Sequence, residues 1–141
     1  MGELYLANGS RARIYTSEKP GQLRGPQHHV GWGDEPAHWK DAKDGDAEGT
    51  TWSNLKLGLR LGSHPRVVLT TTPKPLKLLV GTKDKPGLIH DPTIVVTRGS
   101  TYENLDNLAP TFAEQVLAAY EGTRIGRQEL RAEILEDCLL Y

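Results

Sequence analysis

The chain has 141 residues, with 17 Lys and Arg against 18 Asp and Glu, which gives a formal net charge of −1 at pH 7. A protein that coats nucleic acid by itself carries a large positive surplus, so the charge disfavours that class. The single cysteine, Cys138, excludes an intrachain disulfide and a four-cysteine zinc site. The longest apolar runs are far shorter than the roughly 20 residues that span a bilayer, which argues against a membrane protein. With hydrophobic residues at 37%, 15 Gly and 9 Pro, we expect one loop-rich domain over residues 1–141.

The first third of the chain predicts β structure followed by a loop. Apolar and polar residues alternate in 4–6 and again in 12–16, and the turn pair Asn8-Gly9 lies between them, which is typical of a β-hairpin. Gly and Pro residues make 17–27 a connecting loop. Residues 30–33 then form a short, weakly apolar strand candidate.

The middle of the chain combines a polar run, a helix and a strand. Residues 41–49 are rich in Gly and acids, and we interpret them as an exposed loop insertion that is dispensable to the core. Apolar residues at helical spacing predict an amphipathic helix over 51–61. The β-branched run 66–71, which Pro73 ends, predicts a buried parallel strand.

The last part of the chain alternates further helices and strands. We expect a short helix around 76–80, a second buried strand over 93–97, a helix from Pro110 to near Gly122, and another helix over 127–135. Strands that alternate with helices at this spacing predict an α/β fold. It would have a mostly parallel sheet flanked by helices, after the N-terminal hairpin.

Two adjacent acids, Asp34 and Glu35, follow the first strand candidate of this sheet. Parallel sheets place ligand sites at the carboxyl ends of their strands. In a phosphate-hydrolysing ATPase, one such carboxylate holds the hydration shell of Mg²⁺ and the other polarises the attacking water. The alternative interpretation is an exposed acidic pair that merely ends a strand.

Three hydroxyl groups, on Thr70, Thr71 and Thr72, end the next strand along the chain. If the two strands are neighbours in the sheet, these hydroxyls lie beside the two acids, where they could sense a γ-phosphate. Threonine also favours strands for conformational reasons, so the run alone leaves a purely structural role open.

Several arginines are candidates for contacts with phosphate or with a partner. Arg24 and Arg98 each lie beside a predicted strand, where a planar guanidinium could meet phosphate oxygens. Arg124, Arg127 and Arg131 form a basic run on the last helix, which suits a DNA or subunit contact. Solvated surface arginines are the alternative in each case. The sequence contains no Gly-rich loop followed by Lys-Ser or Lys-Thr, and its five His residues lack metal-ligand spacing.

Several sequence blocks follow one another in a specific order: Leu23-Arg24-Gly25-Pro26-Gln27, Gly33-Asp34-Glu35 with Trp39, Thr51-Trp52 with Leu57-Gly58-Leu59-Arg60-Leu61-Gly62, Thr70-Thr71-Thr72-Pro73-Lys74-Pro75, Thr97-Arg98-Gly99-Ser100-Thr101-Tyr102-Glu103-Asn104 and Tyr120-Glu121-Gly122-Thr123-Arg124-Ile125-Gly126-Arg127-Gln128-Glu129-Leu130. In their order and spacing, these blocks resemble the large terminase subunit of tailed bacteriophages. The resemblance covers nearly the whole chain, from about Leu4 to Asp137.

The resemblance implies the C-terminal half of the terminase ATPase domain, a partial P-loop NTPase fold that in its intact form hydrolyses ATP to drive viral DNA into a preformed capsid. It implies that Asp34 is the Mg²⁺-side acid and Glu35 the catalytic carboxylate of a Walker B motif. Thr70, Thr71 and Thr72 would form the coupling motif that relays loss of the γ-phosphate to movement of DNA. The implied cofactors are ATP and Mg²⁺. The implied partners are double-stranded DNA, the portal protein and the small terminase subunit, in the cytoplasm of the bacterial host at the procapsid portal.

In that family a phosphate-binding loop precedes the segment seen here and a metal-dependent nuclease domain follows it, and the 141 residues contain neither. We therefore expect a fragment of the packaging motor, of phage or prophage origin, that binds no nucleotide tightly and is inactive alone. A sheet that lacks its phosphate-loop strand should expose an edge or an apolar face and favour self-association. The alternative is a non-catalytic interaction module that binds a portal, a small terminase subunit or a partner ATPase.

Overall fold

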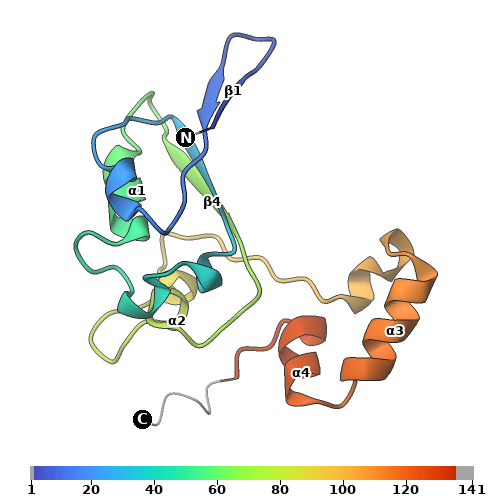
Figure 1. Ribbon diagram of the computed structural model, residues 1–141. Coiled ribbons are helices and arrows are strands. Elements are labelled where there is room, and N and C mark those ends of the chain that lie inside the picture. Colours follow the sequence, from blue (N-terminus) through green and yellow to red (C-terminus); the bar gives the residue numbers. More distant parts are fainter. Residues whose placement is uncertain (1, 136–141) are drawn as a thin grey trace. The chain divides into compact units, whose positions relative to one another are not determined.

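A computed structural model describes residues 2–135 of the chain, so Cys138 lies outside the described residues (Figure 1). The chain divides into two compact units, residues 1–70 and residues 71–141. Both helices and strands are present, which makes the protein a mixed α/β protein, as predicted. No helix of the described part is long and apolar enough to cross a membrane.

The first unit begins with the predicted hairpin. Strand β1 (Glu3–Tyr5) pairs antiparallel with β2 (Arg11–Arg13), with Glu3 opposite Arg13 and Tyr5 opposite Arg11. The turn between the strands includes Gly9, whose φ of 84° is left-handed and therefore suits glycine. The alternating pattern and the turn pair located this element correctly.

A parallel strand pair and one helix form the centre of the first unit. Strand β3 (Val30–Asp34) pairs in parallel with β4 (Arg66–Thr70), and helix α1 (Thr51–Gly58) covers one face of the pair. Helix α1 lies close to β3, because a Cβ added at Gly31 would lie 3.2 Å from Cδ1 of Leu55. The opposite face leaves apolar side chains exposed: Val30 at 63%, Trp32 at 73% and Val68 at 57%. The expectation of an exposed apolar sheet face is confirmed.

Helix α1 is held at its start by the polar run that precedes it. The Thr50 hydroxyl accepts a hydrogen bond from Ser53 N (3.3 Å), and the Asp41 carboxylate accepts from both Thr51 N (2.6 Å) and Thr51 Oγ1 (3.0 Å). Ala42, in a 3₁₀ turn at Ala42–Asp44, is 2% exposed. The prediction that 41–49 is dispensable to the core is therefore wrong, because this run caps α1 and contributes a buried side chain.

The end of α1 also differs from the prediction, which extended the helix to residue 61. The helix ends at Gly58, and the backbone N–H groups of Arg60 and Leu61 both donate to the carbonyl oxygen of His28 (3.2 Å each). The His28 carbonyl thus accepts the two hydrogen bonds that helix carbonyls would accept if α1 continued. Further short 3₁₀ turns occupy Pro20–Leu23 within the predicted loop and Pro36–His38 after β3.

The second unit is mostly helical. It contains α2 (Lys77–Val80), α3 (Pro110–Tyr120) and α4 (Arg124–Arg131), together with 3₁₀ turns at Leu88–His90 and Tyr102–Asn107. The first two helices agree with the prediction. Helix α4 begins earlier than the expected residue 127, because the Thr123 hydroxyl caps it by accepting from Gly126 N (2.9 Å).

The strand predicted over 93–97 is absent from the structure, and this correction reduces the expected sheet to a single parallel pair. The segment runs without regular secondary structure, and Val95 is 91% exposed. β-branched residues fit a pleated surface, but a strand also needs a neighbour to which its backbone can hydrogen-bond. Within residues 2–135 no strand pairs with this segment.

Candidate functional site

The carboxyl end of the β3–β4 pair brings two of the predicted motifs together. The register places Asp34 opposite Thr70, and the Thr70 hydroxyl donates a hydrogen bond to Asp34 Oδ1 (3.0 Å). The same hydroxyl accepts from Nε1 of Trp32 (3.1 Å), and Glu35 N donates to the Thr70 carbonyl (2.7 Å). The first threonine of the predicted run is therefore bonded to both residues of the acid pair.

Glu35 has an unusual backbone at the point where β3 ends. Its φ of 44° and ψ of 55° are left-handed, a conformation that costs a non-glycine residue about 1 kcal/mol or more. This turn ends the strand directly after Asp34. Nδ1 of His38 lies 3.6 Å from Oε2 of Glu35, so an imidazole stands beside this acid.

Trp39 packs against the strand that carries the acids. Its Nε1 donates to the carbonyl oxygen of Asp34 (2.9 Å), and a Cβ added at Gly33 would lie 2.7 Å from the Trp39 ring and 2.6 Å from Leu69. Because Gly33 has no Cβ, the Trp39 indole can pack directly against the backbone of β3 next to the two acids. Trp39 belongs to the sequence block with Gly33-Asp34-Glu35, whereas sequence reasoning assigned His38 no role here, and the available signal was its position four residues after Asp34.

The other two threonines lie in the second unit. The Thr71 hydroxyl donates to the Thr72 carbonyl (3.1 Å), and the Thr72 hydroxyl donates to Oε2 of Glu129 on α4 (3.5 Å). Both side chains are half-buried. The three hydroxyls thus have different partners: Thr70 bonds the strand that carries the acids, whereas Thr72 bonds the helix of its own unit.

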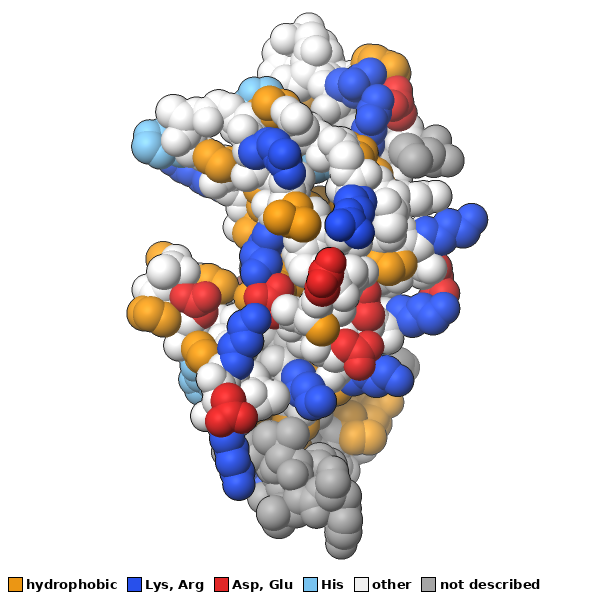
Figure 2. All heavy atoms as spheres, turned by 90° about the vertical axis from the view of Figure 1, so that its left-hand side faces the viewer, with side chains coloured by type: hydrophobic (Ala, Val, Ile, Leu, Met, Phe, Trp, Pro, Cys, Tyr) orange, Lys and Arg blue, Asp and Glu red, His pale blue; other side chains and the backbone are white. Residues whose placement is uncertain are grey.

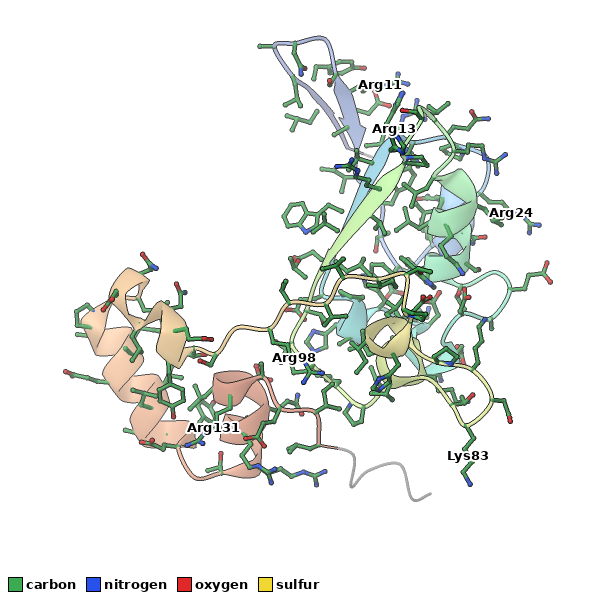
Figure 3. The ribbon with its side chains drawn as sticks, turned by 180° about the vertical axis from the view of Figure 1, so that it is seen from behind. Arg11, Arg13, Arg24, Lys83, Arg98 and Arg131 are labelled. Carbon is green, nitrogen blue, oxygen red and sulfur yellow. The ribbon has the colours of Figure 1, made fainter. Side chains whose placement is uncertain are left out.

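Arg24 is separated from the acid pair. It follows the 3₁₀ turn Pro20–Leu23 and lines a shallow pocket with Ser53, Lys56 and Leu57 on the outer side of α1. Figure 3 shows it pointing away from the sheet. This position suits a partner contact better than a contact with phosphate held at Asp34.

The remaining predicted arginines belong to the second unit. Nε of Arg127 donates to Oε2 of Glu133 (2.7 Å), and the Arg131 guanidinium lies 5.8 Å from the centre of the Tyr102 ring. Arg124 is the first residue of α4, and Arg98 is exposed in the segment before the turn Tyr102–Asn107. Two side chains of the predicted basic run therefore support the packing of their own unit.

The oxygen atoms at Asp34 fit the ligand preference of Mg²⁺. A carboxylate and a hydroxyl are hard donors, and Mg²⁺ in phosphate sites is commonly held by one or two carboxylates through water. Among residues 2–135, no three His, Cys, Asp or Glu side chains gather as a metal site. Asp34 and Thr70 could hold the ion only through its water shell and together with phosphate oxygens.

Comparison with known proteins gives one match. Residues 2–137 match the model of a family described as terminase large subunit, T4likevirus-type, N-terminal. No curated protein and no solved structure matches the chain. The matched range covers the hairpin, the acid pair, the threonine run and all the helices described above.

Proposed function

The chain belongs to the family of T4likevirus-type large terminase subunits, N-terminal part, and we propose that its acid pair belongs to the ATP-hydrolysing site of a motor that packages phage DNA. The family supports the packaging role. The observation that carries the site assignment is the hydrogen bond from the Thr70 hydroxyl to Asp34, with Glu35 N bonded to the Thr70 carbonyl at the same strand ends. Carboxyl ends of parallel strands are where such sheets bind ligands.

Each residue at these strand ends has a distinct task in the proposal. Asp34 holds the water shell of Mg²⁺, which when bound neutralises charge on the transferred phosphoryl group. Glu35 polarises the attacking water from the end of β3, where its backbone is left-handed. His38, 3.6 Å from Glu35, orients that carboxylate.

The threonine run links the acids to the second unit. Thr70 is bonded to Asp34, whereas Thr72 is bonded to Glu129 on α4. A change in the charge beside Asp34 therefore alters a hydrogen bond at one end of a three-residue segment whose other end is tied to a helix. We assign to this segment the coupling between hydrolysis and movement of DNA.

In this proposal, a separate or further polypeptide segment supplies the phosphate cradle of the site. Phosphoryl transfer depends on positioning and on electrostatic clamping, and no G-x-x-x-x-G-K-[ST] sequence is present to supply backbone amides and a lysine. The chain alone is therefore expected to turn over no ATP. The portal protein and the small terminase subunit are the partners proposed for the assembled motor, in the host cytoplasm.

Complementation tests this proposal. Release of phosphate from ATP is measured for the purified chain alone, and then with a separate polypeptide that carries the phosphate-binding half of the ATPase domain. We expect hydrolysis only in the mixture, and Glu35→Gln should reduce it at least about 100-fold, as expected when a positioned general base is lost. The matched control is Glu114→Gln on α3, an exposed glutamate far along the chain.

Three outcomes would contradict the proposal or part of it. Hydrolysis by the chain alone that depends on Glu35 would disprove the inactivity of the isolated chain. Equal hydrolysis by wild type and Glu35→Gln in the mixture would remove Glu35 from the chemistry. Binding to a portal or a small terminase subunit, with no gain in turnover in the mixture, would instead support a non-catalytic interaction module.

A further inference from the structure

The acidic residues of the first unit are unevenly distributed along the sequence. Between Glu18 and Asp34 the sequence has no acid, and it has none between Glu48 and Asp84. The acids of 34–48 lie between the carboxyl end of β3 and the start of α1. Both acid-free stretches contribute residues to the amino end of the strand pair, where β3 begins at Val30 and β4 at Arg66.

Backbone hydrogen bonds hold several basic residues at this amino end. The N–H of Arg66 donates to the carbonyl of His29 (3.1 Å), and the N–H of Arg60 donates to the carbonyl of His28 (3.2 Å). The carbonyl of Leu57 accepts from Nε of Arg60 (2.7 Å), which fixes the guanidinium at the end of α1. A Cβ added at Gly62 would lie 3.1 Å from the His29 ring, so the loop after α1 closes onto β3.

The hairpin adds two arginines to the same end. The Tyr15 ring meets the His28 ring edge-on with centroids 5.6 Å apart, and the Arg13 charge acts on His28 as well. Figure 3 shows Arg11 and Arg13 beside the start of the parallel strand pair. Glu3 pairs with Arg13 (2.8 Å) and is an acid of the same hairpin. The top of Figure 2, which is the hairpin end in Figure 1, accordingly shows blue and pale blue side chains with little red.

We call this surface the basic rim and define it by side chains that are exposed at the amino end: Arg11, Arg13, His29, Arg60, His64 and Arg66. We propose that the basic rim binds the phosphate backbone of duplex DNA. This inference rests on the proposed function, since the packaged polymer is then the polyanion that the motor handles. The Asp34 site lies at the opposite end of β3, so the rim holds the DNA phosphates away from the acid pair.

The chemistry of the basic rim favours a nucleic acid over an acidic protein. A duplex presents one regular sign of charge, and a surface on which basic side chains outnumber acids, here with Glu3 as an acid beside Arg13, complements it. Arginine forks bind phosphate oxygens in a bidentate manner. A two-stranded ribbon of the size of β1–β2 also fits the major groove of B-DNA.

Duplex binding by the whole 141-residue chain tests this inference. The affinity for a labelled 30-base-pair duplex is measured by fluorescence anisotropy at several salt concentrations, for wild type and for the triple variant Arg11→Gln, Arg60→Gln, Arg66→Gln. Each lost phosphate contact lowers the slope of log K against log salt by about 0.9. We expect the triple variant to lower the slope by about 2.7 and the affinity by about two orders of magnitude at ~0.1 M salt.

Two further variants test whether a loss of DNA binding comes from the basic rim itself or from the change in net charge, and a folding check accompanies them. Lys19→Gln, Lys43→Gln, Lys83→Gln removes the same charge from exposed positions outside the rim and should leave the affinity within about 3-fold, since bulk charge is screened beyond about 10 Å. The charge-conserving triple of Arg11→Lys, Arg60→Lys and Arg66→Lys should retain most of the binding. Circular dichroism checks that each variant folds.

Each result decides the inference. Wild type that binds no duplex, or equal losses in the two glutamine triples, would overturn it, as would a rim-dependent affinity for poly-glutamate that exceeds the affinity for DNA. Loss of DNA binding confined to the rim triple supports it. Hydrolysis in the complementation mixture is measured without DNA, so it does not depend on the basic rim. DNA binding can therefore fail while Glu35-dependent hydrolysis is observed, and hydrolysis can fail while DNA binding by the rim is observed.

Discussion

Gly33 sits between two side chains that leave no room for a Cβ. Replacement by alanine would place that atom 2.6 Å from Leu69 and 2.7 Å from the Trp39 ring. Because overpacking of this kind forces neighbours to shift, we expect Gly33→Ala to lower the free energy of unfolding by about 1–3 kcal/mol. Urea unfolding measures this loss. Gly21→Ala, at a position with no heavy atom within 4 Å, is the matched control and should change stability by less than about 0.5 kcal/mol.

His28 should make the stability of the first unit depend on pH. Burial, and then the Arg13 charge, lower the pKa of His28 from its usual value of 6.5. Its Nε2 is buried and has no hydrogen-bond partner within the described part of the chain. The unfolded chain therefore binds this proton more readily than the folded chain, so stability is complete above pH 6.5 and falls as the pH drops below that value.

The variant His28→Gln tests this dependence. Denaturant midpoints measured from pH 8 down to pH 5 should fall less steeply for His28→Gln than for wild type. His90→Gln, which removes an exposed imidazole from the second unit, is the control. Identical slopes for His28→Gln and wild type would show that the Arg13 charge and burial do not act on this residue as described.

Residues at the strand ends were the part of the site that sequence could predict. Asp34 and Thr70 each follow a strand run, and parallel pairing alone brings them together. The contributions of Trp39 and His38 were not predictable in this way. They depend on the left-handed turn at Glu35, and a glutamate gives no sign in the sequence that its backbone will adopt that conformation.

Among the elements, α1 depends most on a segment outside itself. Asp41 satisfies two donors at the first turn of the helix, and its charge lies at the positive end of the helix dipole. We expect Asp41→Ala to cost about 1–2 kcal/mol in urea unfolding. Asp44→Ala, three residues on and exposed, removes the same charge as a control. If the two variants lost equal stability, the loss would come from removing a negative charge and not from the hydrogen bonds that Asp41 accepts.

Elements with a local signature were predicted well, and elements that need a distant partner were not. The hairpin, β3, β4, α2 and α3 follow from turn residues, β-branched runs and helical spacing. The burial predicted for β4 is wrong, however, since none of its residues is buried and Val68 is 57% exposed. The strand expected over 93–97 had the same β-branched pattern as β4 but no partner among the described residues. Burial of Ala42 was not predictable for a similar reason, because it depends on the folded surroundings and not on the local sequence.

For the whole molecule, the uncovered face of the parallel pair predicts self-association. Parallel sheets normally have both faces covered, yet Val30 and Val68 remain more than half exposed beside Trp32. The double variant Val30→Thr, Val68→Thr keeps the branched shape that strands favour and makes this face polar. We expect it to shift the sedimentation coefficient toward that of the monomer at concentrations where wild type associates.

Val95→Thr is the matched control for that measurement, since Val95 is 91% exposed and belongs to the second unit, whereas the strand pair belongs to the first. Equal effects of the control and the double variant would show that general hydrophobicity drives association. Wild type that remains monomeric throughout would contradict the prediction directly. Fold class was predictable at this scale, but the number of strands was not, because pairing is a property of the assembled sheet.

The left-handed backbone at Glu35 has an evolutionary consequence. Glycine adopts this conformation without a steric penalty, so Glu35→Gly should raise the melting temperature while removing the carboxylate. Lineages cultured under selection for heat resistance alone should therefore accumulate glycine at this codon. Lineages that must also fill their capsids should keep glutamate, and sequencing the two sets would reveal which demand has governed position 35.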